Sequence, residues 1–182
     1  MVQLKTESLV IRDLFFTDLE NIHYLHSLPE AEVHNTLGIP DTLQTTEKLL
    51  VDWLEKQKHF QRSCYVLGME LHEINEFLGL IALNLGNPKF KMAEMWYKIH
   101  VSTWQDAHTI EALKKLLDFA FNHLNLHRIE VGCAFNNVLS IKALEKVGMT
   151  REGKKRKFLP MRGEWIDCYL YSILDEDFGL KI

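Results

Sequence analysis

Several features are scarce in this chain, and each scarcity excludes a class of protein. Among 182 residues there are three cysteines (Cys64, Cys133 and Cys168), each inside an apolar run, which predicts buried free thiols in a reducing compartment rather than a disulfide framework. No apolar run is long enough to cross a bilayer, and the segment MVQLKTESL lacks the apolar core of a secretory signal. We therefore expect no membrane partner and a cytoplasmic protein.

Metal-ligand clusters and an excess of basic charge are missing too. The close histidine pairs, His23 with His26 and His123 with His127, have no cysteine or carboxylate at ligand spacing, so we expect no metal site. A net charge of −4 argues against general nucleic-acid binding, which needs a basic surface. With 47% hydrophobic residues and no repeat or linker, the sequence predicts a single domain over residues 1–182 with a sizeable core.

Glycine is absent between Gly86 and Gly132, yet this stretch holds the most informative pattern of the chain. Residues 92–101 alternate apolar and polar, which predicts a half-buried strand, and residues 110–124 repeat apolar positions at helical spacing. The polar turn 102–108 joins them. The first N–H groups of a helix are unpaired and carry the positive end of its dipole, so this turn can hold an anion. An ordinary strand–helix connection is the alternative.

The remaining elements follow from periodicity and from turn and capping signals. Thr17 and Glu20 form a capping-box pattern for the first helix, Asn136 or Asn137 is expected to cap the last one, and Gly148 to end it. The resulting order, β-α-α-β-β-β-α-β-α-β-β, predicts an α+β fold around one mixed sheet. The further expected strands are 9–12, 64–71, 76–85, 127–134, 149–158 and 165–174, and the further helices are 17–28, 45–61 and 136–147.

Short motifs along nearly the whole chain resemble the GNAT acetyltransferases, in particular the branch with the ribosomal-protein N-terminal acetyltransferases and spermidine acetyltransferases. The motifs are Leu9-Val10-Ile11-Arg12, Ala93-Glu94-Met95-Trp96-Tyr97, Glu111-Ala112-Leu113, Leu117-Asp118-Phe119-Ala120-Phe121, His127-Arg128-Ile129-Glu130, Asn137-Val138-Leu139-Ser140, Leu144-Glu145-Lys146-Val147-Gly148-Met149, Arg151-Glu152-Gly153, and Gly163 and Trp165 to Ser172. The resemblance implies a GNAT fold: a single mixed, mostly antiparallel sheet of about seven strands, splayed at its centre, with about four helices on its faces.

The resemblance also implies where acetyl-CoA binds. The central strand would diverge from the strand 127–134, with the pantetheine arm inserted between them. The backbone of Ile99 and Val101 would pair with that arm, the turn 104–109 would cradle the pyrophosphate, and Asn137 would face the same cleft. The residues implied for the cofactor are Ile99, His100, Val101, Trp104, Gln105, Asp106, Ala107, His108, Thr109 and Asn137.

The turn departs from the family pattern Q/R-x-x-G-x-G/A. It reads Trp104-Gln105-Asp106-Ala107-His108-Thr109, without glycine, and Asp106 stands at an often basic position. Its backbone donors are unchanged, but a carboxylate about 4 Å from a phosphate repels it by roughly 1 kcal/mol in water and more near a protein wall. A protonated His108 would partly offset this repulsion.

The candidate catalytic residues are Ser140 and Glu94. Many GNAT enzymes place a proton-donating tyrosine where this chain has Leu144; in the ribosomal-protein branch a serine is proposed instead, and Ser140 matches it. Its alternative role is to satisfy a backbone N–H in the first helical turn. Glu94 is the candidate base, and its alternative is a strand-surface glutamate paired with Lys98 or another cation. The glutamate that serves as base near the last hairpin in the branch is replaced by the basic run 154–157.

Two functions remain open from the sequence. The first is an acetyl-CoA-dependent N-acetyltransferase that acts on a primary amine of a protein N-terminus, a polyamine or a small molecule. The alternative is a GNAT-fold binding or regulatory module that has lost acetyl transfer because its pyrophosphate loop lacks glycine. The resemblance also allows a homodimer through strand edges. The basic run 154–157 is interpreted as a solvated strand end, with a contact to the cofactor's 3′-phosphate or to an acidic partner as the alternatives.

Overall fold

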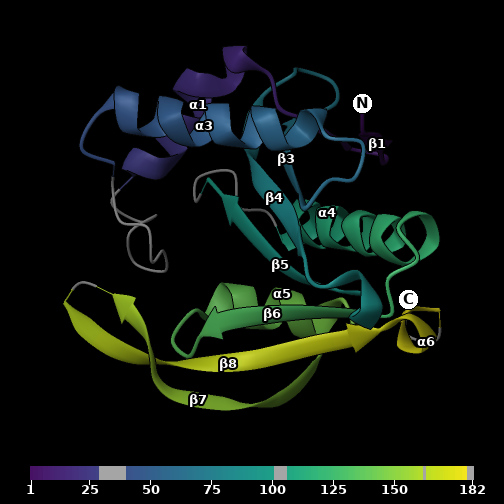
Figure 1. Cartoon of the computed structure of the whole chain (residues 1–182). Helices are drawn as coiled ribbons and strands as arrows, with labels where there is room; N and C mark the ends of the chain where they lie inside the picture. Colours follow the sequence, from purple (N-terminus) through teal and green to yellow (C-terminus); the bar gives the residue numbers. More distant parts are fainter. Residues whose placement is uncertain (29–39, 101–105, 162, 180–182) are drawn as a thin grey trace.

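The computed structural model describes residues 1–28, 40–100, 106–161 and 163–179, and these build an eight-stranded mixed sheet (Figure 1). The strand order is β1-β2-β3-β4-β5-β6-β8-β7. All neighbours are antiparallel except β5 and β6, which run parallel. The strands are β1 Gln3–Lys5, β2 Leu9–Asp13, β3 Cys64–Leu71, β4 Phe77–Leu85, β5 Met92–Ile99, β6 Arg128–Ala134, β7 Thr150–Met161 and β8 Glu164–Leu174.

Helices cover both faces of the sheet (Figure 1). They are α1 Leu19–Ser27, α3 Leu43–Lys58, α4 Asp106–Asp118, α5 Val138–Lys146 and the short α6 Asp175–Phe178, and α4 continues into a π-helical turn at Phe119–His123. The larger core lies between the sheet and α4 and α5, and a smaller one lies under α1 and α3. The expected α+β fold around one mixed sheet is confirmed, and the described residues hold eight strands where about seven were expected and five helices where about four were expected.

The extra strand and one helix start were not predicted correctly. β1 pairs with β2 but spans only Gln3–Lys5. A strand of this length is too short to show apolar–polar alternation in the sequence. Thr17 does not cap α1; it lies inside a 3-10 turn, and Asp18 accepts a hydrogen bond from the Phe15 N–H at 2.8 Å. The buried Asp18 also binds the Arg12 guanidinium, so an ion pair to β2 sets this helix start.

Other local predictions are confirmed. Asn137 caps α5, because its side-chain oxygen accepts a hydrogen bond from the Ser140 N–H at 3.1 Å. Gly148 follows this helix with φ of 89°, a conformation that glycine adopts without strain. Apart from these predictions, Trp96 of β5 packs against Trp53 of α3, with ring centroids 6.1 Å apart. The three cysteines are free thiols.

Candidate functional site

β5 and β6 separate soon after they begin, which opens a wedge in the middle of the sheet. Only three residue pairs join them: Met92 with Arg128, Ala93 with Ile129, and Glu94 with Glu130. Among the described residues, β5 then continues to Ile99 paired with β4, while β6 continues to Ala134 paired with β8. Figure 1 shows the two arrowheads well apart. The predicted divergence of these strands is confirmed, with its apex at Glu94 and its mouth at their carboxyl ends.

The edge of β5 that faces the wedge offers backbone hydrogen-bonding groups. The Met92 carbonyl accepts from the Gly86 N–H, and the His100 N–H donates to the Leu78 carbonyl, so even-numbered residues use their backbone toward β4. Because alternate residues of a strand point these groups to opposite edges, the N–H and C=O of Tyr97 and Ile99 face the wedge. An extended polar molecule can therefore bind along β5 like an added strand.

A hydrogen bond between two hydroxyls connects β5 to the helix below the wedge. The Tyr97 hydroxyl lies 2.6 Å from Ser140 Oγ, and either can be the donor. Ser140 is buried in the first turn of α5, where Asn137 already satisfies its N–H, so its hydroxyl is not needed as a cap. Burial raises the pKa of Tyr97, which keeps its phenol protonated at neutral pH.

Tyr97 was not among the residues singled out from the sequence, although it belongs to the motif Ala93-Glu94-Met95-Trp96-Tyr97. Its place on the apolar side of the strand pattern suggested packing. Only the contact with Ser140, 43 positions away, identifies it as part of the site. Cys133 of β6 lies beside this pair, and burial raises the pKa of its thiol, so it is a neutral neighbour.

Glu94 lies exposed at the apex of the wedge, next to Glu130 of β6. The alternative pairing of Glu94 with Lys98 is not found: the Lys98 amine is buried and has no hydrogen-bond partner among the described residues. Glu130, the neighbour of Glu94 on β6, accepts a hydrogen bond from the Arg128 guanidinium at 2.7 Å. By strand alternation Glu94 points to the face opposite Tyr97, so the two candidates reach the wedge from different sides.

The expected pyrophosphate turn is described only from Asp106 onward, where α4 begins. Val101, Trp104 and Gln105 lie outside the described residues. Ala107 is exposed and His108 half-buried. Thr109 in the first turn of α4 is 1% exposed, and its hydroxyl has no hydrogen-bond partner within the described ranges. A buried hydroxyl without a partner is costly, so Thr109 is a group that a ligand can satisfy.

His100 was expected to contact the cofactor. Its backbone N–H donates to the Leu78 carbonyl at 2.9 Å, and its ring stacks on Tyr24 of α1 at 5.4 Å between centroids. His100 thus lies at the mouth of the wedge but turns toward α1. There it lines a polar hollow of about 470 Å³ together with residues of α1, of the β3–β4 turn and of the start of β4, namely Asn21, Tyr24, Leu25, Asn75, Glu76 and Phe77.

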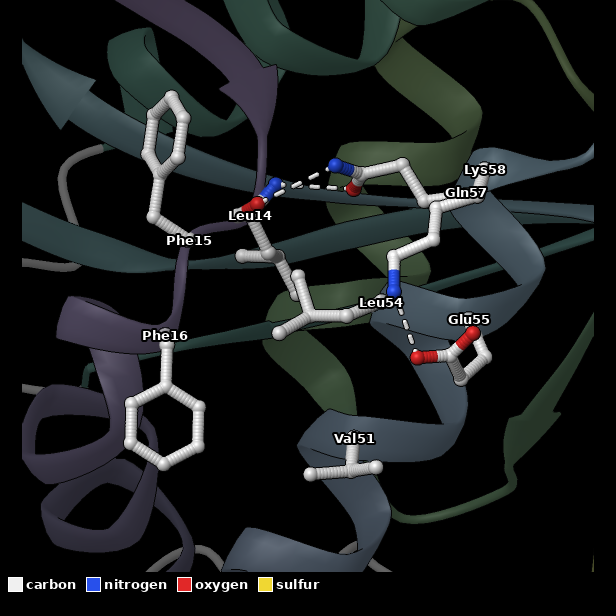
Figure 2. Close-up of a pocket in the computed structure, with 8 residues that line it drawn as sticks. All are labelled: Leu14, Phe15, Phe16, Val51, Leu54, Glu55, Gln57 and Lys58. Carbon is white, nitrogen blue, oxygen red and sulfur yellow. Dashed lines mark hydrogen bonds and ion pairs between the residues drawn. The ribbon is translucent and has the colours of Figure 1, made fainter.

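A second hollow, of about 360 Å³, lies between α3 and the segment after β2 (Figure 2). Leu14, Phe16 and Leu54 give it an apolar lining, and the Gln57 amide exchanges two hydrogen bonds of 3.2 Å with the Leu14 backbone. It contains none of the residues of the wedge, and its two charged side chains, Glu55 and Lys58, are paired with each other at 2.6 Å. We therefore place no reaction there.

Two further properties concern ligands and membranes. Among the described residues, no three histidine, cysteine, aspartate or glutamate side chains gather in a cluster able to hold a metal ion. Within the same ranges, no helix is both long and apolar enough to cross a bilayer.

The chain is similar to known acetyltransferases in sequence and structure. The family described as Acetyltransferase (GNAT) domain matches residues 8–150. The uncharacterized N-acetyltransferase p20 of Bacillus licheniformis is 27% identical over 98% of this chain and 99% of its own. Two solved structures share the fold: ribosomal-protein-S5-alanine acetyltransferase from Vibrio fischeri (TM-score 0.84, 20% identity, 98% of this chain and 99% of that one) and spermidine N-acetyltransferase from Vibrio cholerae with CoA and spermine (TM-score 0.84, 21% identity, 96% and 99%). The chain belongs to the GNAT acetyltransferase family and is an N-acetyltransferase.

Proposed function

We propose that this enzyme transfers an acetyl group from acetyl-CoA to a primary amine, and that it does so in the wedge between β5 and β6. The observation that carries the proposal is the early end of β5–β6 pairing at Glu94: beyond it, within the described residues, β5 pairs with β4 and β6 with β8, and the two strands no longer pair with each other. A ligand with amide groups can hydrogen-bond to such a strand edge in the way that an added strand does.

The residues present fit acetyl-CoA. The backbone of Tyr97 and Ile99 would hold the amide groups of the pantetheine arm. The unpaired N–H groups at the start of α4 and the Thr109 hydroxyl would hold the pyrophosphate. Asp106 opposes this binding by its charge, so we expect a modest affinity. Bound there, acetyl-CoA supplies a thioester, whose carbonyl carbon accepts an amine and whose sulfur departs.

Ser140 and Tyr97 fit the role of proton donor to the departing sulfur. In the transfer the C–N bond forms and the C–S bond breaks, so the sulfur needs a proton. Ser140 Oγ stands at the start of α5 and can donate its hydrogen, while the Tyr97 hydroxyl at 2.6 Å donates to Ser140 in turn. The raised pKa of Tyr97 keeps this chain of hydroxyls protonated at neutral pH.

Glu94 remains our candidate for removing a proton from the acceptor amine. The ammonium form cannot attack, and an alkylamine has a pKa near ~10, so a base or a water chain is required. Glu94 is exposed at the apex of the wedge, where water can connect its carboxylate to an amine.

The chain's placement in the ribosomal-protein and spermidine acetyltransferase branch rests on its motifs and is part of this proposal. A cytoplasmic location is supported by the free thiols Cys64, Cys133 and Cys168. A homodimer and the single-domain organisation of residues 1–182 stay predictions. The loss of transfer that the glycine-free turn suggested is disfavoured, because Thr109 and the helix amides provide donors that need no glycine.

Isothermal titration with acetyl-CoA, combined with an assay of thiol release, tests the proposal. Thr109→Val keeps the side-chain shape and removes the hydroxyl, so we expect acetyl-CoA affinity to fall about tenfold, as for one lost hydrogen bond to a charged group. The unfolding temperature of the free protein should stay equal or rise, because the hydroxyl is unsatisfied there. The control is Thr150→Val at an exposed position. Absence of binding heat in the wild type would overturn the proposal.

A further inference from the structure

The β7–β8 hairpin extends past the end of the wedge. The last β6–β8 contacts are the pairing of Ala134 with Cys168 and the hydrogen bond from the Phe135 N–H to the Asp167 carbonyl at 3.1 Å. Residues 156–161 and 164–167 therefore project beyond β6, and we call them the hairpin arm. Because β5 and β6 are parallel and diverge from their amino ends, the arm lies at the mouth of the wedge, on the β6 side (Figure 1).

The arm together with the β7 residues that lead into it carries a net positive charge on a chain that is acidic overall, because the cations of 151–157 outnumber the acids Glu152, Glu164 and Asp167. Residues 151–157 contain five cations and one acid in a protein of net charge −4. Lys154 is paired with Asp167 at 2.9 Å, and the single acid, Glu152, is bound by Arg128. Arg156 and Lys157, both exposed, form no salt bridge with a described residue. The acids of the arm are Asp167, which Lys154 binds, and the exposed Glu164, which pairs with Met161 near the tip, so Arg156 and Lys157 on β7 are the cations left to attract an anionic partner.

A β-bulge displays these cations. The pairing of β7 with β8 is interrupted between Lys155 and Leu159, so Arg156, Lys157 and Phe158 are lifted out of the ladder. Lys157 has φ of 48°, which is uncommon for a residue other than glycine. Asp167 fixes this conformation by accepting from the Lys157 N–H at 2.9 Å. Bulges of this kind redirect side chains and are frequent near active sites.

Exposed aromatic side chains accompany the cations. Phe158 is 48% exposed and Trp165 58% exposed, and the Lys155 amine lies 4.3 Å from the centre of the Phe158 ring. Aromatic and cationic side chains together suit a peptide, which offers backbone and carboxylates, better than a bare phosphate ion. A second copy of this chain does not suit the arm, because edge-to-edge pairing along β7 would bring like charges together.

We propose that the hairpin arm is a docking surface for an acidic peptide segment, and that the acceptor is a polypeptide N-terminus followed by acidic residues. This inference rests on the proposed function, since the amine must reach the wedge while the following residues lie on the arm. A polyamine is a poor fit at this wall, because its cations would face Arg156 and Lys157.

A cation-rich edge strand also has a purely structural explanation, which is protection of β7 against pairing with other chains. Under that explanation charge reversal on the arm changes solubility and leaves acceptor binding unchanged. Contact with the cofactor's 3′-phosphate is the other reading, and it predicts a change in acetyl-CoA binding alone. The three explanations therefore predict different results: protection of the edge changes neither Michaelis constant, contact with the 3′-phosphate changes that for acetyl-CoA, and the docking surface changes that for the peptide.

The test uses short peptides with a free N-terminus, one with glutamates after its second residue and analogues with glutamines or lysines at those positions. We expect the glutamate peptide to have the lowest KM. The double variant Arg156→Glu with Lys157→Glu should raise that KM about tenfold, because it reverses two exposed charges at the edge of the docking surface. The KM for acetyl-CoA should stay unchanged. The matched control is Lys5→Glu with Lys89→Glu, two exposed lysines on β1 and the β4–β5 turn that change the net charge equally.

A binding measurement separates this proposal from the proposed function. Fluorescence anisotropy of the labelled glutamate peptide needs no turnover, and binding should weaken toward about 0.3 M salt as charges are screened. If transfer fails but the peptide still binds the wild type and not the arm variant, the docking surface stands and the acetyl transfer does not. Equal binding to both proteins, no binding to the wild type, or a changed KM for acetyl-CoA alone would each overturn the docking surface.

Discussion

The hydroxyl pair of Ser140 and Tyr97 gives the sharpest test of the chemistry. Ser140→Ala removes the group that we propose as proton donor to the departing sulfur. We expect kcat to fall about 100-fold, the lower end for loss of a general acid, or about 2.7 kcal/mol in the barrier. The KM for acetyl-CoA should change little, since Asn137 and the β5 backbone are untouched. Turnover is followed by thiol release.

The stability cost of the same change follows from the contact. The Tyr97 hydroxyl lies 2.6 Å from Ser140 Oγ in a buried setting. Loss of this bond costs about 1–3 kcal/mol, which lowers the unfolding temperature by roughly 2–4 °C per kcal/mol in a chain of this size. The protein should therefore remain folded at assay temperature, and circular dichroism verifies this before kinetics are compared.

Tyr97→Phe and the double variant establish how the two hydroxyls act. Because Tyr97 acts through Ser140, Tyr97→Phe alone should lower kcat, whereas adding it to Ser140→Ala should cause no further loss. Additive losses would show that the two hydroxyls act separately. If Ser140→Ala lowers the unfolding temperature but leaves kcat unchanged, the two hydroxyls form a structural contact only, and the proton-donor role is refuted.

Two further predictions concern charge near the wedge. Ala107→Gly with Asp106→Lys should tighten acetyl-CoA binding about tenfold by replacing repulsion with attraction at the start of α4, and calorimetry that shows no gain would mean that the turn is already competent or is not the site. Burial lowers the pKa of Lys98 to about 8, so between about pH 8 and 10 the unfolded chain binds more protons and the free energy of unfolding rises with pH, by at most ~1.4 kcal/mol per unit. Lys98→Met should flatten this rise in denaturant titrations, and equal slopes for both proteins would contradict the assignment.

The strands and helices were largely readable from the sequence because their burial is periodic. β3 at Cys64–Leu71 matches its prediction, and β5, β6 and β8 differ by one or two residues at their ends. The start of α1 was misplaced, because the capping-box pattern of Thr17 and Glu20 is local, whereas the Arg12–Asp18 ion pair that fixes it joins two elements. Local propensity is overridden by such tertiary contacts.

The candidate site was only half predictable. Ser140 and Asn137 were found because a motif places them at a helix start, where side-chain polarity has a physical purpose. Tyr97 was missed because strand alternation assigns it to the apolar side. The bulge at Lys157 was missed because the residue that stabilises it, Asp167, lies on the facing strand. Contacts between positions far apart in the chain leave no periodic signal.

The sequence by itself determined the alternation, the helical faces and the order of elements, because each depends on neighbours within a few positions. The tertiary structure decided where β5 and β6 part, which hydroxyl meets Ser140, and that the basic run stands at the mouth of the wedge. Those features arise from the register of strands 30 or more positions apart, and register is fixed by the packing of the whole sheet rather than by any one segment.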